Sequence, residues 1–340
     1  MERRDFFKKA GFAAGGFALA STPVIGKAAP TKTETSPEGI PLRQFGKKGP
    51  KLPVIGFGGA SLPKKWGNPF SWEDRIKNLQ AAYRKGIRYY DTSPDYGESS
   101  DLMGEALEKV RKNIFLVTKV DHITADKTRG EVESELKRLR TDHLDGIMIH
   151  GSPALERMTF EQALKVRDVL FKLRDEKVVK QVGISAHSYY EKALPVIAEG
   201  GLDFCMLACG YFPRADYMRH SARQLEYCRA CIAKAHQQET TVVAMKVMGA
   251  GTLSRDVKKI VPAFPDAASK EVPHAAVRYC LADPRISMLC IGMHEQRNMD
   301  DNIATAKGDT TYTLEDRRIL AEYSVQALES EPIKKLREDA

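Results

Sequence analysis

Residues 87–97 read IRYYDTSPDYG, a short apolar run that closes on Asp91 and is followed by a turn carrying Tyr96. Two later runs end in the same way, NIFLVTK at Lys119 and LDGIMIH at His150. Each run has the length and the aromatic or branched residues of a buried β-strand. Packing alone does not explain these ends, because an unpaired buried charge is unfavourable. The pattern predicts that the charged strand ends meet at a common site.

The same unit, an apolar strand followed by an amphipathic helix, recurs along the chain. Strands are predicted at 53–57, 87–91, 114–119, 144–150, 179–185, 202–207, 241–246 and 286–291. Helices are predicted between them, among them 72–85, 129–140, 160–176 and 222–236, and a final helix at 313–328. Eight such units predict an α/β fold, a (β/α)8 TIM barrel, whose active site lies at the carboxyl ends of the strands.

The segment 89–107, YYDTSPDYGESSDLMGEAL, resembles the Asp-Thr…Tyr-Gly segment of the aldo-keto reductase family. VTK and IMIHG resemble that family's Lys and His strand ends, and the resemblance runs from about residue 52 to about residue 306. It implies a short N-terminal hairpin at 41–45 and a catalytic set of Asp91, Tyr96, Lys119 and His150. A lysine cation beside a tyrosine is expected to lower the phenol's pKa from about 10 toward the range of a working proton donor.

Three later strand ends are expected to hold NADP(H). VVAMKVMGAG, residues 242–251, ends in a turn in which Lys246, Gly249 and Gly251 can approach phosphate oxygens. VGISAH places Ser185 at the family's carboxamide-binding position. CIGMHEQRNMDDNIATA, residues 290–306, resembles the family's adenosine-binding segment. That resemblance implies phosphate contacts by His294 and Arg297, and adenine contacts by Asp301 and Asn302.

Several positions depart from the family pattern around the nicotinamide. Met206 replaces a glutamine, Met245 replaces a stacking aromatic residue, and Ala186 replaces an asparagine with His187 beside it. An alternative is therefore a nucleotide-binding regulatory or accessory protein on the same fold, as in the potassium-channel β-subunits that resemble this family.

A barrel hydrolase or metal enzyme is a second alternative. It would use Asp91 and His150, but it leaves the pairing of Tyr96 with Lys119 unexplained. His150 has no second ligand at a metal-binding spacing, so no metal is expected. Trp66 and Trp72, which follow the first strand, could line a pocket for a small carbonyl substrate.

The N-terminus predicts export. Arg3 and Arg4 precede two phenylalanines and a weakly apolar, Gly/Ala-rich stretch, and residues 26–28, Gly-Lys-Ala, offer small residues for cleavage. This resembles a twin-arginine signal, which implies the twin-arginine export machinery as a partner and a periplasmic location. The predicted organisation is a signal peptide at 1–28, a linker at 29–39 and the barrel at 40–340. A basic tail and a membrane anchor are the alternatives, although the apolar run is too short to span a bilayer.

Composition bounds the remaining possibilities. The chain has 340 residues, 29% of them charged, and a net charge of +8 without a polybasic run, which does not indicate nucleic-acid binding. Its six cysteines include a C-x-x-C at 228–231. Pairing of some of them in an oxidising compartment is one interpretation, and burial as small apolar residues is the favoured one.

Overall fold

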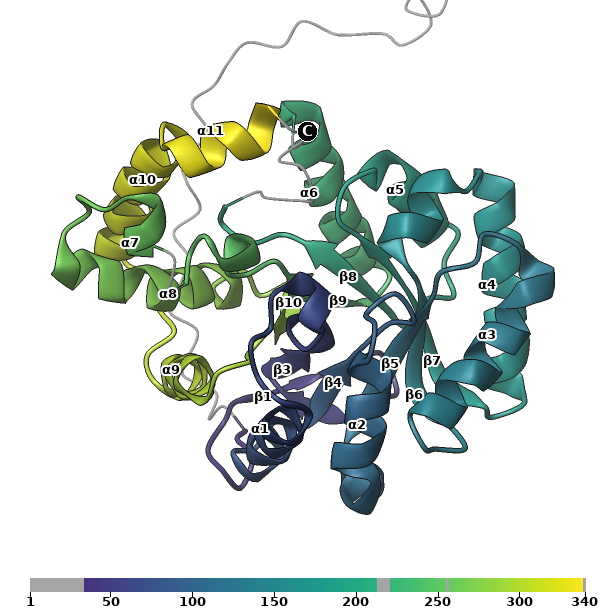
Figure 1. Ribbon diagram of the computed structural model, residues 1–340. Helices are drawn as coiled ribbons and strands as arrows, with labels where there is room; N and C mark the ends of the chain where they lie inside the picture. Colours follow the sequence, from purple (N-terminus) through teal and green to yellow (C-terminus); the bar gives the residue numbers. More distant parts are fainter. Residues whose placement is uncertain (1–33, 213–220, 255–256, 339–340) are drawn as a thin grey trace, which may run out of the picture. The chain divides into compact units, whose positions relative to one another are not determined.

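Eight parallel strands close into a barrel (Figure 1). The structure, a computed structural model, describes residues 34–212, 221–254 and 257–338, so the predicted signal at 1–28 lies outside it. The barrel strands are β3 (Ile55–Gly58), β4 (Tyr89–Asp91), β5 (Phe115–Val120), β6 (Leu144–Ile149), β7 (Val179–Ala186), β8 (Phe204–Ala208), β9 (Thr241–Met245) and β10 (Ile286–Ile291). They follow one another in chain order, and β10 pairs with β3 to complete the ring. The predicted TIM barrel is confirmed.

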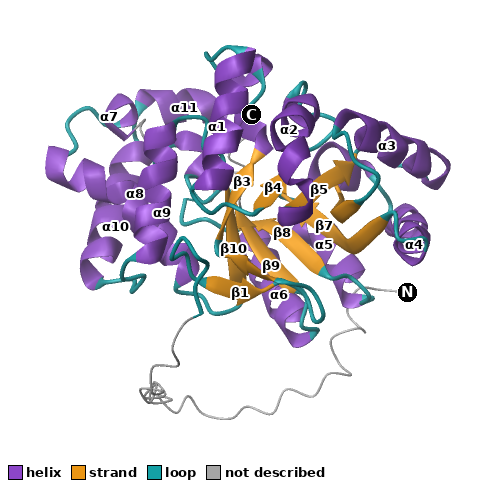
Figure 2. Ribbon diagram, turned by 90° about the horizontal axis from the view of Figure 1, so that it is seen from below, coloured by secondary structure: helices purple, strands orange, loops and turns teal. Residues whose placement is uncertain are grey.

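Helices surround this barrel (Figure 2). They are α1 (Trp72–Arg84), α2 (Ser99–Leu107), α3 (Ala125–Arg138), α4 (Phe160–Asp175), α5 (Tyr190–Ala198), α6 (Ala222–Gln237), α8 (Asp266–Leu281) and α9 (Gln296–Lys307). The α4 helix begins with a capping box, in which Thr159 accepts from the amide of Gln162 and the Gln162 side chain accepts from the amide of Thr159. The α3 helix begins at Ala125, four residues before the predicted start at 129. The predicted start is too late because the residues that open the helix are polar and carry no apolar periodicity.

The hairpin β1 (Leu42–Gln44) and β2 (Lys51–Pro53) precedes the barrel and pairs antiparallel. The strand predicted at 53–57 therefore spans two elements, since Pro53 ends β2 and Ile55 begins β3. Phe45, next to the hairpin turn, is buried inside the barrel, where its ring lies 4.7 Å from that of Phe115 and 5.3 Å from that of Phe204. The hairpin thus closes the amino-terminal end of the barrel, as predicted.

Side chains fill the structure in distinct layers. Phe45, Tyr89, Phe115, Met148 and Phe204 belong to the cluster inside the barrel. A larger apolar layer separates the strands from the surrounding helices. A third cluster joins α7 (Val257–Ile260), α8, α10 (Leu314–Leu328) and α11 (Glu331–Glu338), which lie together in Figure 1. The predicted final helix corresponds to α10.

The chain already contacts the barrel within the predicted linker. Ser36 is buried, and its hydroxyl accepts from the amide of Ile40. The carboxylate of Glu38 accepts from the Arg88 guanidinium at 2.6 Å. Within the described ranges, no helix is both long and apolar enough to cross a membrane.

Candidate active site

The ends of three neighbouring strands bring Asp91, Lys119 and His150 together. Asp91 is the last residue of β4, Lys119 lies near the end of β5, and His150 follows β6. Asp91 pairs with Val117 across the sheet. Because side chains alternate along a strand, Lys119 lies one layer above Asp91 on the same inner face. The residues predicted from the three strand ends therefore share one site at the carboxyl end of the barrel.

The Lys119 ammonium is fully buried and fixed. Its Nζ donates to both carboxylate oxygens of Asp91 at 2.8 Å and to the carbonyl oxygen of Thr92 at 2.6 Å. These three bonds use its three donors. Asp91 is buried as well, and although burial opposes the charge of Lys119, this carboxylate holds the lysine pKa above its ordinary value. The lysine is a fixed positive charge at the base of the site.

Tyr96 lies directly over this charge. The Lys119 Nζ is 4.5 Å from the centroid of the Tyr96 ring. The rings of His150 and Tyr96 pack edge to face with their centroids 5.7 Å apart. The rings of Trp66 and Tyr96 also pack edge to face, with their centroids 5.2 Å apart. Trp66 is 48% exposed and packs against Tyr96, a position that a pocket-lining residue would have. Trp72 does not fulfil the same prediction: it begins α1 and its ring faces Arg75.

The predicted lowering of the Tyr96 pKa is wrong for this structure. Burial raises the pKa of the phenol above its ordinary value, and the opposing effect of Lys119 is smaller and is partly cancelled by Asp91. The cause is desolvation, which penalises a buried phenolate more than one nearby cation stabilises it. Tyr96 therefore keeps its proton at neutral pH, as a proton donor must.

His150 has a partner that the sequence reasoning missed. Its Nδ1 is hydrogen-bonded to Oδ1 of Asp121 and lies 3.3 Å from the Ser93 hydroxyl. Asp121 is the first residue after β5, two residues beyond Lys119. That spacing, which places both side chains on one side of an extended chain, is the signal that could have indicated it.

The turn after β9 bears three of the predicted cofactor residues. Lys246, Gly249, Ala250 and Gly251 all have positive φ, which favours glycine, and Gly249 has no room for a side chain because Thr252 Oγ1 would lie 2.4 Å from its Cβ. The amides of Gly249 and Gly251 donate within the turn, to the carbonyls of Lys246 and Met248. What these glycines contribute here is the left-handed backbone of the turn.

The other predicted phosphate and adenine residues lie in the loop after β10 and on α9. His294 is in the loop, and Arg297 is in the first turn of α9 with its side chain 80% exposed and 3.9 Å from Asp301. Asn302 is buried on the same helix. The N-cap residue of α9, Glu295, makes no side-chain capping hydrogen bond to the helix. A helix N-terminus beside basic side chains suits the phosphate of a dinucleotide.

The residues that the resemblance places around a nicotinamide, Ser185, Met206 and Met245, are all buried. Ser185 is buried at the end of β7, where its hydroxyl accepts from the amide of Gly151 at 2.8 Å and donates to the carbonyl of Ile149 at 3.4 Å. Met206 and Met245 are buried in the barrel interior.

In the described part of the chain, no three His, Cys, Asp or Glu side chains are placed to hold a metal ion. All six cysteines are unpaired, and Cys228 and Cys231 are buried on α6.

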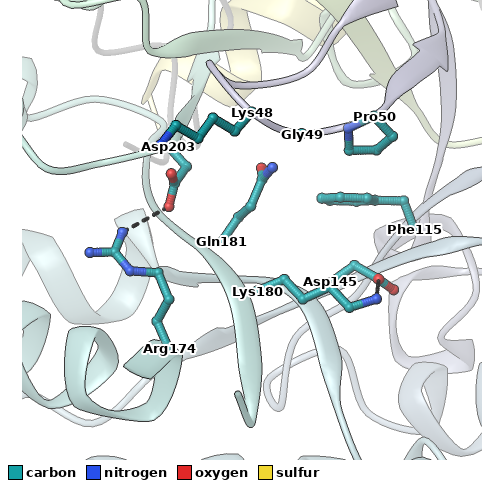
Figure 3. A pocket seen from close by; sticks show the side chains of 9 residues that line it. All are labelled: Lys48, Gly49, Pro50, Phe115, Asp145, Arg174, Lys180, Gln181 and Asp203. Atoms are coloured by element: carbon teal, nitrogen blue, oxygen red, sulfur yellow. Dashed lines mark hydrogen bonds and ion pairs between the residues drawn. The ribbon is translucent and has the colours of Figure 1, made fainter. Parts of the chain in front are cut away.

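The cavity in Figure 3 lies at the opposite end of the barrel. It has a volume of about 680 Å³ and is lined by residues that precede or begin strands, among them Phe115, Asp145, Gln181 and Asp203. Four of its charged side chains form ion pairs: Arg174 donates to Asp203 at 3.0 Å, and Lys180 donates to Asp145 at 2.7 Å. In TIM barrels this end contributes stability, whereas catalytic residues lie at the carboxyl ends of the strands.

Residues 54–312 match the aldo/keto reductase family. The chain belongs to this family. Its members are oxidoreductases that generally use nicotinamide cofactors. The chain is 24% identical over 325 residues to the L-galactose dehydrogenase of Arabidopsis thaliana, covering 87% of this chain and 96% of that protein. It is 28% identical over 246 residues to a D-threo-aldose 1-dehydrogenase of Pseudomonas sp, covering 61% and 69%.

A solved structure agrees with the fold. The holo form of an aldo-keto reductase from Bacillus halodurans superposes with a TM-score of 0.66 at 20% identity, covering 83% of this chain and 95% of that one. At that identity the likeness supports the barrel itself.

Proposed function

We propose that the protein is an NADP(H)-dependent oxidoreductase that reduces an aldehyde or ketone to an alcohol, with Tyr96 as the proton donor. The observation that carries the proposal is the placement of a protonated phenol directly above a fixed, buried ammonium. Such a pair suits a reaction in which negative charge develops on a substrate oxygen and then on the phenol.

Each residue of the site has a distinct part in this reaction. Tyr96 donates its hydroxyl proton to the developing alkoxide, and Lys119 stabilises the phenolate that remains. Asp91 holds Lys119 in place. His150 binds the carbonyl oxygen beside Tyr96. Bound NADPH would supply the hydride, with its phosphates near Lys246, His294 and Arg297.

The names of the relatives guide the choice of substrates. Two of them are dehydrogenases of sugars, L-galactose and D-threo-aldoses. A half-exposed Trp66 edge to face with the Tyr96 ring is suited to contact the C–H face of such a molecule. A substrate panel should therefore contain simple aldehydes for reduction and aldoses for oxidation.

Substitution of Tyr96 by Phe tests the proposal. It removes the proton donor and little else, so kcat should fall about 10²- to 10⁴-fold. Dinucleotide affinity, measured by fluorescence titration, should stay close to wild type. Tyr83→Phe is the matched control, because Tyr83 lies on α1 and its hydroxyl accepts from Asn113 away from the site. Unchanged turnover in Tyr96→Phe would show that Tyr96 is not the acid.

A nucleotide-binding accessory role is the second candidate. The burial of Met206 and Met245 in the barrel interior favours it, because neither side chain offers a strong hydrogen bond to a carboxamide. That role predicts dinucleotide binding without turnover of any substrate in the panel.

We also propose that the protein is exported in folded form by the twin-arginine machinery and acts in the periplasm. Arg3, Arg4 and the weakly apolar stretch behind them support this proposal. A dinucleotide bound before export would then travel with the folded barrel.

A further inference from the structure

Both carboxylate oxygens of Asp121 accept hydrogen bonds. Oδ1 accepts from His150, and Oδ2 accepts from the Ser93 hydroxyl at 3.2 Å and from the amide of Asp95 at 3.0 Å. The side chain is only 13% exposed. Burial raises the pKa of this carboxyl, but the hydrogen bonds from His150 and the Asp95 amide and the nearby charges of His150 and Lys119 together lower it by more. The pKa of Asp121 is therefore below its ordinary value. Asp121 is therefore an ionised carboxylate in a prepared position.

The backbone of this segment is held as well. Glu131, which projects from α3, accepts from the amide of Asp121 at 3.0 Å and from the amide of His122 at 3.2 Å. The segment that follows β5 thus has its own support from the neighbouring helix. The backbone at Asp121 cannot shift away from His150 without breaking these bonds.

A carboxylate that only accepts hydrogen bonds decides which imidazole nitrogen carries the proton. Because ionised Asp121 has no proton to give, Nδ1 of His150 must be the donor. Nε2 is then the nitrogen left for other contacts. The His150 ring is buried, and its centroid lies 5.7 Å from that of the Tyr96 ring, so a substrate oxygen bound by Tyr96 would lie beside the imidazole.

We propose that Asp121 is a positioning residue that holds His150 with its proton on Nδ1, so that Nε2 faces the substrate oxygen. The inference rests on the proposed function of the site. In the neutral ring Nε2 accepts a hydrogen bond from an alcohol, and in the doubly protonated ring it donates one to a carbonyl. Asp121 favours a single ring orientation for both directions of the reaction, as a buried aspartate does for histidine in other enzymes.

The chain contains a matched control pair on its surface. His143 Nδ1 lies 2.7 Å from Asp142 Oδ1, and the side chain of Asp142 is 95% exposed. Asp142→Ala removes the same chemical contact away from the site. It is compared with Asp121→Ala, which removes the acceptor, and with Asp121→Asn, which keeps an amide oxygen that can still accept from Nδ1.

Two measurements test the role. Steady-state kinetics should show kcat lowered about 10- to 100-fold in Asp121→Ala, the worth of one charge-assisted hydrogen bond. KM should change little, Asp121→Asn should be intermediate, and Asp142→Ala should match wild type. In nitrogen NMR spectra, with His150 assigned from a His150→Gln sample, wild-type protein should show the proton on Nδ1. In Asp121→Ala the neutral ring should shift toward the Nε2–H form.

The outcomes separate this inference from the proposed function. A wild-type protein without turnover would contradict the proposed function, while the NMR comparison would still decide the role of Asp121. If Asp121→Ala does not fold, Asp121→Asn carries both measurements. Unchanged kcat together with unchanged His150 nitrogen signals in the variants overturns the inference.

Discussion

At the scale of single residues, the site is a set of charges that are fixed by burial and hydrogen bonds. Lys119 uses all its donors on Asp91 and Thr92, and His150 is bound through Nδ1. Arg297 differs from them, because its side chain is 80% exposed and its nearest carboxylate is 3.9 Å away. It is available to a ligand and contributes little to the fold.

Arg297→Ala should weaken NADPH binding about 10- to 100-fold, since a charge-assisted contact to the 2′-phosphate is lost. NADH, which lacks that phosphate, should bind with nearly wild-type affinity. Titration of both dinucleotides measures the difference. Arg84→Ala, at an exposed arginine near the end of α1, is the control. Equal weakening of both dinucleotides, or of neither, would remove the main local support for NADP.

The sequence predicts some of these residues better than others. Asp91, Lys119 and His150 were found because each ends an apolar run, where a charge is unexpected. Asp121 stands just past a strand, where acidic residues are common, and only its contact with His150 gives it meaning. The direction of the Tyr96 pKa was missed because it depends on burial, which the local sequence does not reveal.

Among the secondary-structure elements, the segment that carries Trp66 is held by hydrogen bonds to α1 and to the residue that precedes α2. Glu98, which precedes α2, accepts from Arg75 of α1 and from the amide of Lys64. Arg75 also donates to the carbonyl of Leu62 at 2.9 Å. Although burial raises the pKa of Glu98, the bonds from Lys64 and Arg75 hold it at about 2.

Glu98→Gln should lower the free energy of unfolding by about 1–3 kcal/mol, because it leaves the buried Arg75 without its carboxylate. The folded pKa of Glu98 lies below the unfolded value of about 4.3. The stabilisation is therefore present above pH about 4.3 and is lost as the pH falls toward 2.

Chemical denaturation at several pH values measures this effect. The difference in the free energy of unfolding between wild type and Glu98→Gln should narrow as the pH falls from 5 to about 3. Glu73→Gln is the control, because Glu73 lies in the first turn of α1 and does not take part in the contact between Glu98 and Arg75. A gap that stays constant over this range would show that the charge of Glu98 does not stabilise the fold.

Elements with a clear period were predictable, and elements that depend on distant packing were not. The strands at 144–150 and 286–291 stand out because each is an isolated apolar run. The start of α3 was placed too late because its first residues are polar. The joining of α7, α8, α10 and α11 around one apolar cluster depends on contacts between distant residues, which no local pattern shows.

At the scale of the whole molecule, the barrel separates stability from chemistry. Phe45 and the ion pairs of the cavity lie at one end of the barrel, and Asp91, Lys119 and His150 meet at the other. Eight repeated units made this architecture predictable from the sequence. The proposed export signal lies outside the described residues.

Replacement of both Arg3 and Arg4 by Lys should keep the precursor in the cytoplasm. The charge is retained, but the guanidinium pair that the export receptor reads is lost. Fractionation of cells expressing wild type and the double variant gives the measurement. Normal accumulation of the double variant in the periplasm would rule out the twin-arginine route.

We propose that this site transfers hydride from a nicotinamide dinucleotide to a carbonyl carbon. NADPH deuterated at the transferring position of C4 tests this transfer, with the product alcohol analysed by mass spectrometry. Deuterium should appear on the former carbonyl carbon with wild-type protein and should be nearly absent with Tyr96→Phe. Tight binding of NADPH with no labelled product from any aldehyde or ketone tested would contradict it.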